Sequence, residues 1–258
     1  MNSLKAELLK CKHSPIILIS FITFAIVPVM SGIFMQLMKN PEVIGNGSAI
    51  NTKMEMLNVS ANWDAMFMIL KQGMGIGGVL IFGFLVSWLF GREYSDNTLK
   101  DILSLPTSKT KIINAKFTVY FLWAIALAIS NFLLGMIFGI ILHLPDFDAV
   151  ACWIHIQEYA FTTLLTILLG ILIAFFAMLG RGYLAPLGFV VLSVVFSQII
   201  GAIGWGHYFP WAIPALYSGV AGDYKEQLNM MSYVVLIIVS IAGYCMAVMY
   251  WKNTDHCK

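Results

Sequence analysis

Several long stretches of this sequence contain no charged residue, and this feature limits the folds that the chain can adopt. Such stretches run from Pro15 to Met38 and over residues 72–91, 117–142 and 159–180. Each reaches the roughly 20 residues that an α-helix needs to cross a bilayer. The whole chain is 60% apolar and 11% charged, whereas soluble domains are about 25% charged. We therefore expect an all-α integral membrane protein with a single transmembrane domain over residues 1–258.

The longest charge-free stretch, residues 182–222, is about twice as long as one span. Its first half predicts a fifth span over Tyr183–Ile203. The stretch Trp205–Pro214 is rich in aromatic residues and proline, which suits an interfacial or re-entrant outer hairpin better than a straight helix in lipid. The alternative is a further full span after a turn near Gly201–His207. A sixth span is expected over Met230–Trp251.

The lysine and arginine residues test this arrangement, because loops rich in these residues stay in the cytoplasm. With six spans, eleven of the fifteen lie on the side of the termini and four on the other side. Both termini are therefore predicted to be cytoplasmic in a bacterial cell membrane. A seventh span would weaken this bias. The inner set is Lys5, Lys10, Lys12, Arg92, Lys100, Lys109, Lys111, Lys116, Arg181, Lys252 and Lys258, and the outer set is Lys39, Lys53, Lys71 and Lys225.

Two shorter segments flank the first spans. Residues 1–14 predict a basic interfacial helix in which Leu4, Leu8 and Cys11 share one face. Residues 39–71 predict an outer loop whose last part, Trp63–Leu70, leads into the second span as an interfacial helix. That span begins with the glycine-rich run Gly73–Gly78, which we interpret first as a loose helix entry. The alternatives are a close helix–helix contact and a close approach of the backbone to a transported molecule.

The segment Gly91–Lys116 is the longest strongly charged stretch between two apolar blocks, and it holds five of the fifteen basic residues. Asp96 or Thr98 can cap a short helix, and Thr98 begins a capping-box spacing in which Asp101 replaces the preferred Glu. The apolar residues that follow fall on one side of this helix, which Pro106 ends. Thr107 or Ser108 then caps a second helix that continues into the third span. Two interpretations stay open: the short helix lies on anionic lipid, or it docks on a cytoplasmic partner.

Several kinds of chemistry have no support in the sequence. None of the predicted spans contains an internal charged residue, which argues against ion-coupled transport. The HExxH and GxSxG motifs of membrane hydrolases do not occur. The four cysteines have no metal-ligand spacing, and no basic tract is long enough to predict a nucleic-acid partner. We expect neither an enzyme nor a metal site.

The polar residues within the spans are few. The clearest are Asn131, Ser193, Ser197 and Gln198. Hydrogen bonding between helices is the leading interpretation of each, worth on the order of 0.6 kcal/mol per contact. The second interpretation is that Ser197, Gln198 and Asn131 line a substrate path, with Ser197 and Gln198 the better candidates because they precede the predicted hairpin.

The charged segment resembles the first cytoplasmic loop of ABC type-2 permeases, the membrane subunits of ATP-binding-cassette exporters. The residues that carry the resemblance are Glu93–Lys109, EYSDNTLKDILSLPTSK, followed by Ala115-Lys116-Phe117. The sequence departs from the pattern at Asn97, where many members have Gly, and at Lys109, where many have Arg. The stretch Tyr208–Pro214 and the chain length resemble the bacitracin-resistance and lantibiotic-immunity branch.

The resemblance implies partners: a second permease, identical or related, and soluble ATPase subunits that hold ATP and Mg²⁺, with no cofactor in this chain. Residues 92–116 would form the coupling loop and residues 1–14 the connecting helix. The first, second and fifth spans would contribute to the dimer seam. The substrate would be an amphipathic antimicrobial peptide or drug. A membrane sensor or lipid-binding scaffold is the alternative. The implied ATPase-coupling residues are Leu99, Ile102 and Leu103 as apolar contacts and Glu93, Asp96 and Lys100 as a charged rim, with Thr98 at the helix start.

Overall fold

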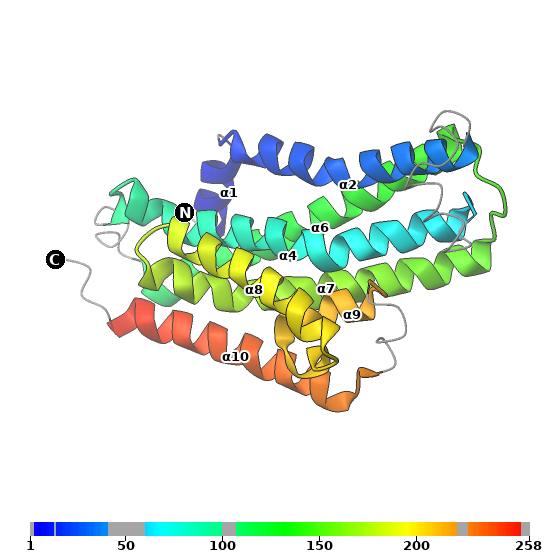
Figure 1. The fold of residues 1–258 in the computed structure, drawn as a ribbon. Coiled ribbons are helices and arrows are strands. Elements are labelled where there is room, and N and C mark those ends of the chain that lie inside the picture. The colour runs from blue at the N-terminus through cyan, green and yellow to red at the C-terminus, as the bar shows by residue number, and fades with distance from the viewer. Residues whose placement is uncertain (1–2, 13, 41–59, 100–106, 221–226, 254–258) are drawn as a thin grey trace.

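The computed structural model describes residues 3–12, 14–40, 60–99, 107–220 and 227–253 (Figure 1). Within these residues the regular structure is helical, and six helices are long and apolar enough to cross a membrane. A short helix, α1, precedes them. The predicted all-α fold with six spans is therefore confirmed. The helices are α1 (Ser3–Lys12), α2 (Ile16–Lys39), α4 (Trp63–Ser95), α6 (Lys109–Ile141), α7 (Ala149–Leu179), α8 (Leu184–Ala202) and α10 (Met230–Asn253).

Two of the long helices begin well before the predicted spans. The second span was expected to start at Gln72 and the fourth after Glu158, because charged residues were taken as span ends. Instead, α4 starts at Trp63 and has 33 residues, and α7 starts at Ala149 and has 31. A helix of 33 residues is about 50 Å long, which exceeds the roughly 30 Å hydrocarbon core. Both helices therefore extend beyond a bilayer core.

Side-chain caps fix both of these helix starts. The side chain of Asn62 accepts a hydrogen bond from the Ala65 N–H (3.0 Å), and Asp148 accepts from the first N–H groups of α7. Asn and Asp are preferred at this position because a short side chain can satisfy an N–H group that has no partner within the helix. The predicted interfacial helix Trp63–Leu70 is thus the first part of α4 itself.

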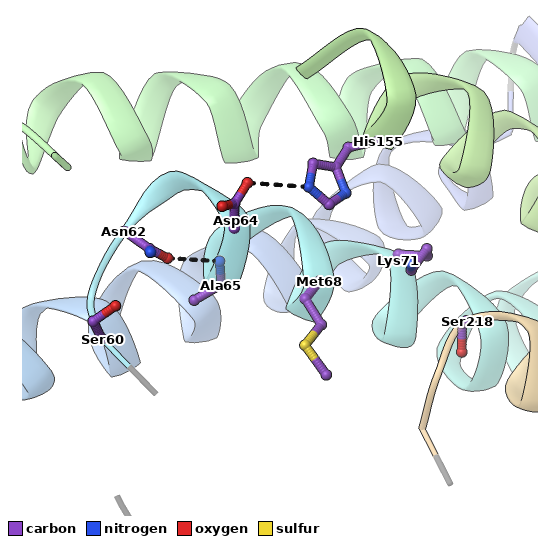
Figure 2. Close-up of a pocket in the computed structure, with 8 residues that line it drawn as sticks. All are labelled: Ser60, Asn62, Asp64, Ala65, Met68, Lys71, His155 and Ser218. Atoms are coloured by element: carbon purple, nitrogen blue, oxygen red, sulfur yellow. Dashed lines mark hydrogen bonds and ion pairs between the residues drawn. The ribbon is translucent and has the colours of Figure 1, made fainter. Parts of the chain in front are cut away.

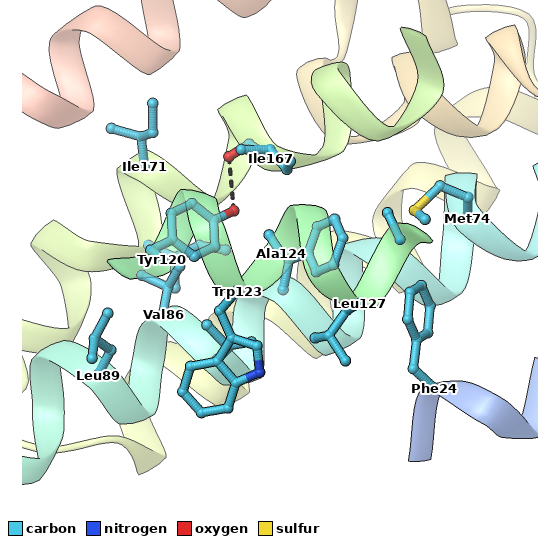
Figure 3. Close-up of a cluster of buried hydrophobic side chains, with 14 of the residues drawn as sticks. Phe24, Met74, Val86, Leu89, Tyr120, Trp123, Ala124, Leu127, Ile167 and Ile171 are labelled. Carbon is cyan, nitrogen blue, oxygen red and sulfur yellow. Dashed lines mark hydrogen bonds between the residues drawn. The ribbon is translucent and has the colours of Figure 1, made fainter. Parts of the chain in front are cut away.

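Helices α4 and α7 form the centre of the bundle. Their most apolar segments are 61% and 72% buried within the chain, against 28–33% for the other four long helices. The outer helices α2, α6, α8 and α10 therefore leave apolar faces that suit lipid. Between them lies the apolar core, where the Tyr120 hydroxyl donates to the Ile167 carbonyl (2.8 Å; Figure 3).

The glycine-rich run Gly73–Gly78 lies inside α4 and permits close contacts. A Cβ atom on Gly73 would lie 2.4 Å from the Val27 side chain of α2. One on Gly75 would lie 2.8 Å from the Pro214 carbonyl oxygen. Because neither position has room for a larger residue, the interpretation of this run as a loose helix entry is wrong, and the close-contact alternative describes it.

After α8 the chain forms two 3₁₀ turns, η2 (Gly206–Tyr208) and η3 (Pro210–Ala212), and the short helix α9 (Ile213–Tyr217). This segment packs beside α4, α7 and α8 (Figure 1), and the residues from Pro210 to Leu216 are buried. It is thus a packed turn segment rather than a further span, within the described residues. That this segment is a re-entrant or interfacial hairpin on the outer side of the membrane stays a prediction.

Helix α1, the start of α6 and the end of α10 lie at the same end of the bundle (Figure 1). The Ser3 hydroxyl donates to the Lys111 carbonyl, and the Lys109 ammonium donates to the Lys252 carbonyl. The two terminal helices therefore share one end, which we call the loop end because α4 also finishes there. That this end is cytoplasmic stays a prediction from the charge distribution.

Candidate functional site

Helix α4 ends in a tight turn that leads into the predicted coupling loop. The Thr98 N–H donates to the Glu93 carbonyl (3.1 Å), the Asn97 N–H donates to the Tyr94 carbonyl (3.4 Å), and Asn97 has a φ of 55°. This is a Schellman helix end, in which Gly or Asn occupies the left-handed position. Asn97 therefore adopts the backbone geometry for which many family members use Gly at this position.

The predicted coupling residues differ in their exposure. Asp96 and Thr98 are exposed, so they are available to a partner. Leu99 is 8% exposed and belongs to the apolar core of the chain. Glu93 is 1% exposed, so its assignment to an exposed charged rim is wrong. The remaining predicted coupling residues, Lys100, Ile102 and Leu103, lie outside the described residues.

Glu93 instead belongs to a charge cluster that joins α1, α4 and α6. Its carboxylate lies 2.7 Å from the Lys116 ammonium and 3.3 Å from that of Lys10. The Glu7 carboxylate lies 2.9 Å from the Arg92 guanidinium and 3.0 Å from the Lys10 ammonium. Four of the five residues are at most 7% exposed. We call these five residues, Glu7, Lys10, Arg92, Glu93 and Lys116, the loop-end cluster.

The loop-end cluster determines how α1 is held. Burial alone would raise the pKa of Glu7, but Lys116, Lys10 and Arg92 outweigh it and lower that pKa. Glu7 is therefore ionised at neutral pH and buried against cations. Cys11 on this helix is buried and Leu8 is 43% exposed, and the position of the helix at the membrane interface stays a prediction.

The sequence contains one signal that could have revealed the cluster. Glu7 is the single acidic residue among the three lysines of residues 1–14. An acid in a basic arm is best explained by a cationic partner, and Arg92 and Lys116 were available at the ends of two spans. That pairing becomes visible only when α1 is placed against α4 and α6.

The three residues of the predicted substrate path do not come together. Asn131 is 1% exposed, its amide donates to the Phe24 carbonyl (2.9 Å), and its oxygen accepts from the Tyr159 hydroxyl (3.3 Å). This bonding joins α2, α6 and α7, so the helix-bonding interpretation is confirmed for Asn131. Ser197 is buried and donates within α8 to Val194, whereas Gln198 is exposed.

A pocket of about 370 Å³ lies at the far end of α4, opposite the loop end (Figure 2). Its walls come from the start of α4, from α7 and from the turn after α9. We call it the Asp64 pocket. The lining residues are Ser60, Asn62, Asp64, Ala65, Met68, Lys71, His155 and Ser218.

Ion pairs connect the two helices beside this pocket. The Lys71 ammonium lies 2.5 Å from the Glu158 carboxylate, and the His155 Nε2 atom lies 3.2 Å from Asp64 (Figure 2). The His155 ring also packs against that of Phe67, with centroids 5.2 Å apart. Lys71 and Glu158 thus pair with each other across α4 and α7. Because both helices are longer than a bilayer core, the expectation that the spans hold no internal charge stays a prediction.

Comparison with known proteins decides the family. The sequence model described as "ABC-2 family transporter protein" matches residues 3–198, which is more than half of the chain. The chain belongs to the ABC-2 transporter family. It is 24% identical over 179 residues to the "Bacitracin transport permease protein BCRB" of Bacillus licheniformis, an alignment that covers 69% of this chain and 85% of that protein. None of the solved structures matches.

As an ABC-2 permease, the chain is a multi-pass membrane protein and a transmembrane subunit of an ABC transporter. The resemblance predicted from the loop Glu93–Lys109 is confirmed as family membership, and the bacitracin permease agrees with the predicted branch. The matched region runs from α1 to α8 and contains the whole loop-end cluster. It also contains every residue of the Asp64 pocket except Ser218.

Proposed function

We propose that this permease exports an amphipathic antimicrobial peptide or drug from the cell or the membrane, driven by a separate ATPase. The observation that carries the proposal is the exposed turn Asp96–Thr98, which ends the central helix of an ABC-2 permease at the loop end. A soluble ATPase subunit that binds ATP and Mg²⁺ contacts this turn and the loop after it. This chain itself holds no nucleotide and catalyses no reaction.

The fold supports a mechanical route from this turn into the bundle. Helix α4 is one unbroken helix from Trp63 to Ser95, so a push on its loop end displaces it as a rigid body. The loop-end cluster ties α1 and α6 to the same helix end through buried ion pairs. ATPase movement at Asp96 and Thr98 is therefore transmitted to three helices together.

A second permease copy, identical or related, completes the transporter in this proposal. The outer face of α8 is apolar, with Val195, Phe196 and Ile199 each at least 50% exposed. Gln198 lies exposed on the same helix, and a polar amide gains hydrogen bonds more readily from another helix than from lipid. This face is the contact that we assign to the second copy.

The alternative function, a sensor or lipid-binding scaffold, has a specific observation in its favour. Lys111 is exposed at the loop end and Lys109 is partly exposed there, where anionic lipid headgroups would attract them. Lys116, in contrast, is 1% exposed and ion-paired within the chain. A lipid-binding function would therefore depend on Lys109 and Lys111 and not on Lys116.

Copurification from native membranes in mild detergent, followed by an ATP hydrolysis assay, separates the two functions. The test variant is Asp96→Arg/Thr98→Arg, because both side chains are exposed and a cation is compatible with a helix C-terminus. The comparison variant is Lys109→Gln/Lys111→Gln. We expect the first variant to lose the ATPase partner at normal membrane levels and the second to keep it. A preparation without any ATPase, even from the unsubstituted protein, would favour the lipid-binding function.

A further inference from the structure

The Asp64 pocket is remote from the loop end, and the proposed coupling does not use it. Its volume of about 370 Å³ lies in the range of roughly 300–1,000 Å³ that is typical of small-molecule sites. It combines charged, hydroxyl and apolar groups within one hollow (Figure 2).

The pocket is lined by Asp64 and Lys71, and a second carboxylate, that of Glu158, lies beside it. Lys71 lies against Glu158 at 2.5 Å, so that the two charges offset each other. Asp64 keeps 60% of its side-chain surface exposed, and among the described residues its carboxylate lies 3.2 Å from the His155 ring. Leaving His155 aside, the formal charges of Lys71, Glu158 and Asp64 sum to one negative charge. A carboxylate has about four acceptor sites, so Asp64 can accept further hydrogen bonds from a ligand.

The rest of the lining suits the neighbourhood of a cation on an apolar molecule. Met68 is 45% exposed, and its flexible thioether side chain adapts to apolar groups of different shape. The exposed Ser60 supplies a hydroxyl group, whereas the hydroxyl of the buried Ser218 already donates to the Ala215 carbonyl (2.7 Å). An anionic ligand would meet the Asp64 carboxylate, and the Asn62 side chain already occupies the Ala65 N–H at this helix start.

We propose that the Asp64 pocket binds the ammonium or guanidinium group of an amphipathic molecule, with its apolar part against Met68. Asp64 accepts the charge-assisted hydrogen bonds, and the Lys71–Glu158 pair and His155 hold α4 and α7 in place around it. This inference rests on the proposed function only where it identifies the ligand with the transported molecule. Binding itself requires neither the ATPase nor transport.

The test measures binding to the full-length permease alone in phosphatidylcholine nanodiscs, whose lipid carries no net charge. The probe is dansylcadaverine, a primary ammonium on an apolar fluorescent group, and its N-acetyl derivative is the uncharged comparison. Empty nanodiscs provide the background for partition into lipid. We expect saturable binding of dansylcadaverine that Asp64→Asn weakens about tenfold, because it removes a charge-assisted hydrogen bond. The N-acetyl probe should bind weakly, and equally, to both proteins.

The matched control is Asp146→Asn at the same end of the bundle. Pro145, its neighbour, accepts a hydrogen bond from the Trp63 N–H, yet Asp146 does not line the pocket. Asn tolerates the φ of 61° at this position. Asp146→Asn should leave dansylcadaverine binding within about twofold of the unsubstituted protein. Thermal unfolding of both variants verifies that they are folded.

Three results would overturn the proposal: equal affinity for the charged and the acetylated probe, no effect of Asp64→Asn, or equal losses from Asp64→Asn and Asp146→Asn. A second variant, Asp64→Lys, should abolish the preference for dansylcadaverine and favour dansyl-6-aminohexanoate, which carries a carboxylate. Because no ATPase is present, negative binding leaves the exporter proposal untouched. Failure to find an ATPase partner would equally leave a positive binding result standing.

Discussion

The removal of one charge from the loop-end cluster should release α1 from the bundle. Glu7→Gln is the sharpest change, because Glu7 contacts Arg92 at 2.9 Å, Lys10 at 3.0 Å and Lys116 at 3.4 Å. Lys116 retains Glu93 at 2.7 Å, and Lys10 is 40% exposed and counts for little. The cost therefore comes mainly from Arg92, which loses its carboxylate partner while it stays buried. Breaking a buried pair costs about 3–5 kcal/mol, and we expect about 3 kcal/mol here.

The thiol of Cys11 reports whether α1 is docked. Cys11 is 2% exposed, and burial raises the pKa of its thiol, so labelling by a maleimide is slow in the docked state. In a variant whose other cysteines are replaced by serine, labelling depends on transient release of α1. Since 1.4 kcal/mol corresponds to a tenfold change, a loss of about 3 kcal/mol predicts labelling that is roughly a hundredfold faster.

Two comparisons make this prediction refutable. Lys5→Gln changes an exposed charge on the same helix and should alter the labelling rate less than about twofold. The double variant Glu7→Gln/Arg92→Gln removes both charges of one ion pair and leaves no buried guanidinium without a carboxylate. It should therefore label more slowly than Glu7→Gln alone, because the effects of two residues in contact are not additive. If Glu7→Gln and Lys5→Gln label equally fast, the cluster does not hold α1, and the reasoning from buried charge is wrong.

Three further predictions concern pH, close packing and polar contacts. The pKa of the Glu7 carboxyl is lowered in the folded protein. Its contribution to folding stability is therefore present above the unfolded pKa of about 4.3 and is lost as the pH falls through the folded pKa. The difference in melting temperature between the unsubstituted protein and Glu7→Gln should shrink between pH 7 and pH 3. Gly75→Ala should destabilise the protein by about 1–3 kcal/mol, because the added Cβ atom would lie 2.8 Å from a backbone carbonyl oxygen. In Gly77→Ala the nearest atom to the added Cβ lies at 3.8 Å, so this variant should be neutral or stabilising in thermal unfolding. Equal effects of the two variants would contradict the close packing described for the run Gly73–Gly78. Asn131→Leu removes the hydrogen bond to the Phe24 carbonyl and should lower the free energy of unfolding by about 1 kcal/mol in the same assay. A loss of transport without a loss of stability would instead favour the interpretation that Asn131 lines a substrate path.

The positions of the six spans could be predicted because long charge-free stretches have few other uses in a protein. The starts of α4 and α7 could not, since Lys71 and Glu158 were treated as charges that must leave the membrane. A charge ends an apolar stretch but does not end a helix, and α4 and α7 both continue past these two residues, which pair with each other. A pair of opposite charges on different spans therefore conceals the true helix ends in a one-dimensional reading.

The candidate site was predictable only in part, for a similar reason. The loop after α4 has a local pattern, so Thr98 and the turn before it could be identified from sequence. The burial of Glu93 and Leu99 depends on contacts with distant elements. The Asp64 pocket likewise combines residues from α4, α7 and the turn after α9, and no spacing along the chain relates them.

Photo-crosslinking in cells tests the central claim, that the loop end contacts an ATPase, most directly. A benzoylphenylalanine placed at position 98 lies in the exposed turn after α4, and one at position 146 lies next to Pro145, which accepts a hydrogen bond from Trp63 at the other end of α4. The account predicts an adduct from position 98 to a soluble protein with a GxxxxGK[ST] phosphate loop, identified by mass spectrometry, and none from position 146. Adducts to such a protein from position 146 alone, or from neither position in a complex that hydrolyses ATP, would contradict it.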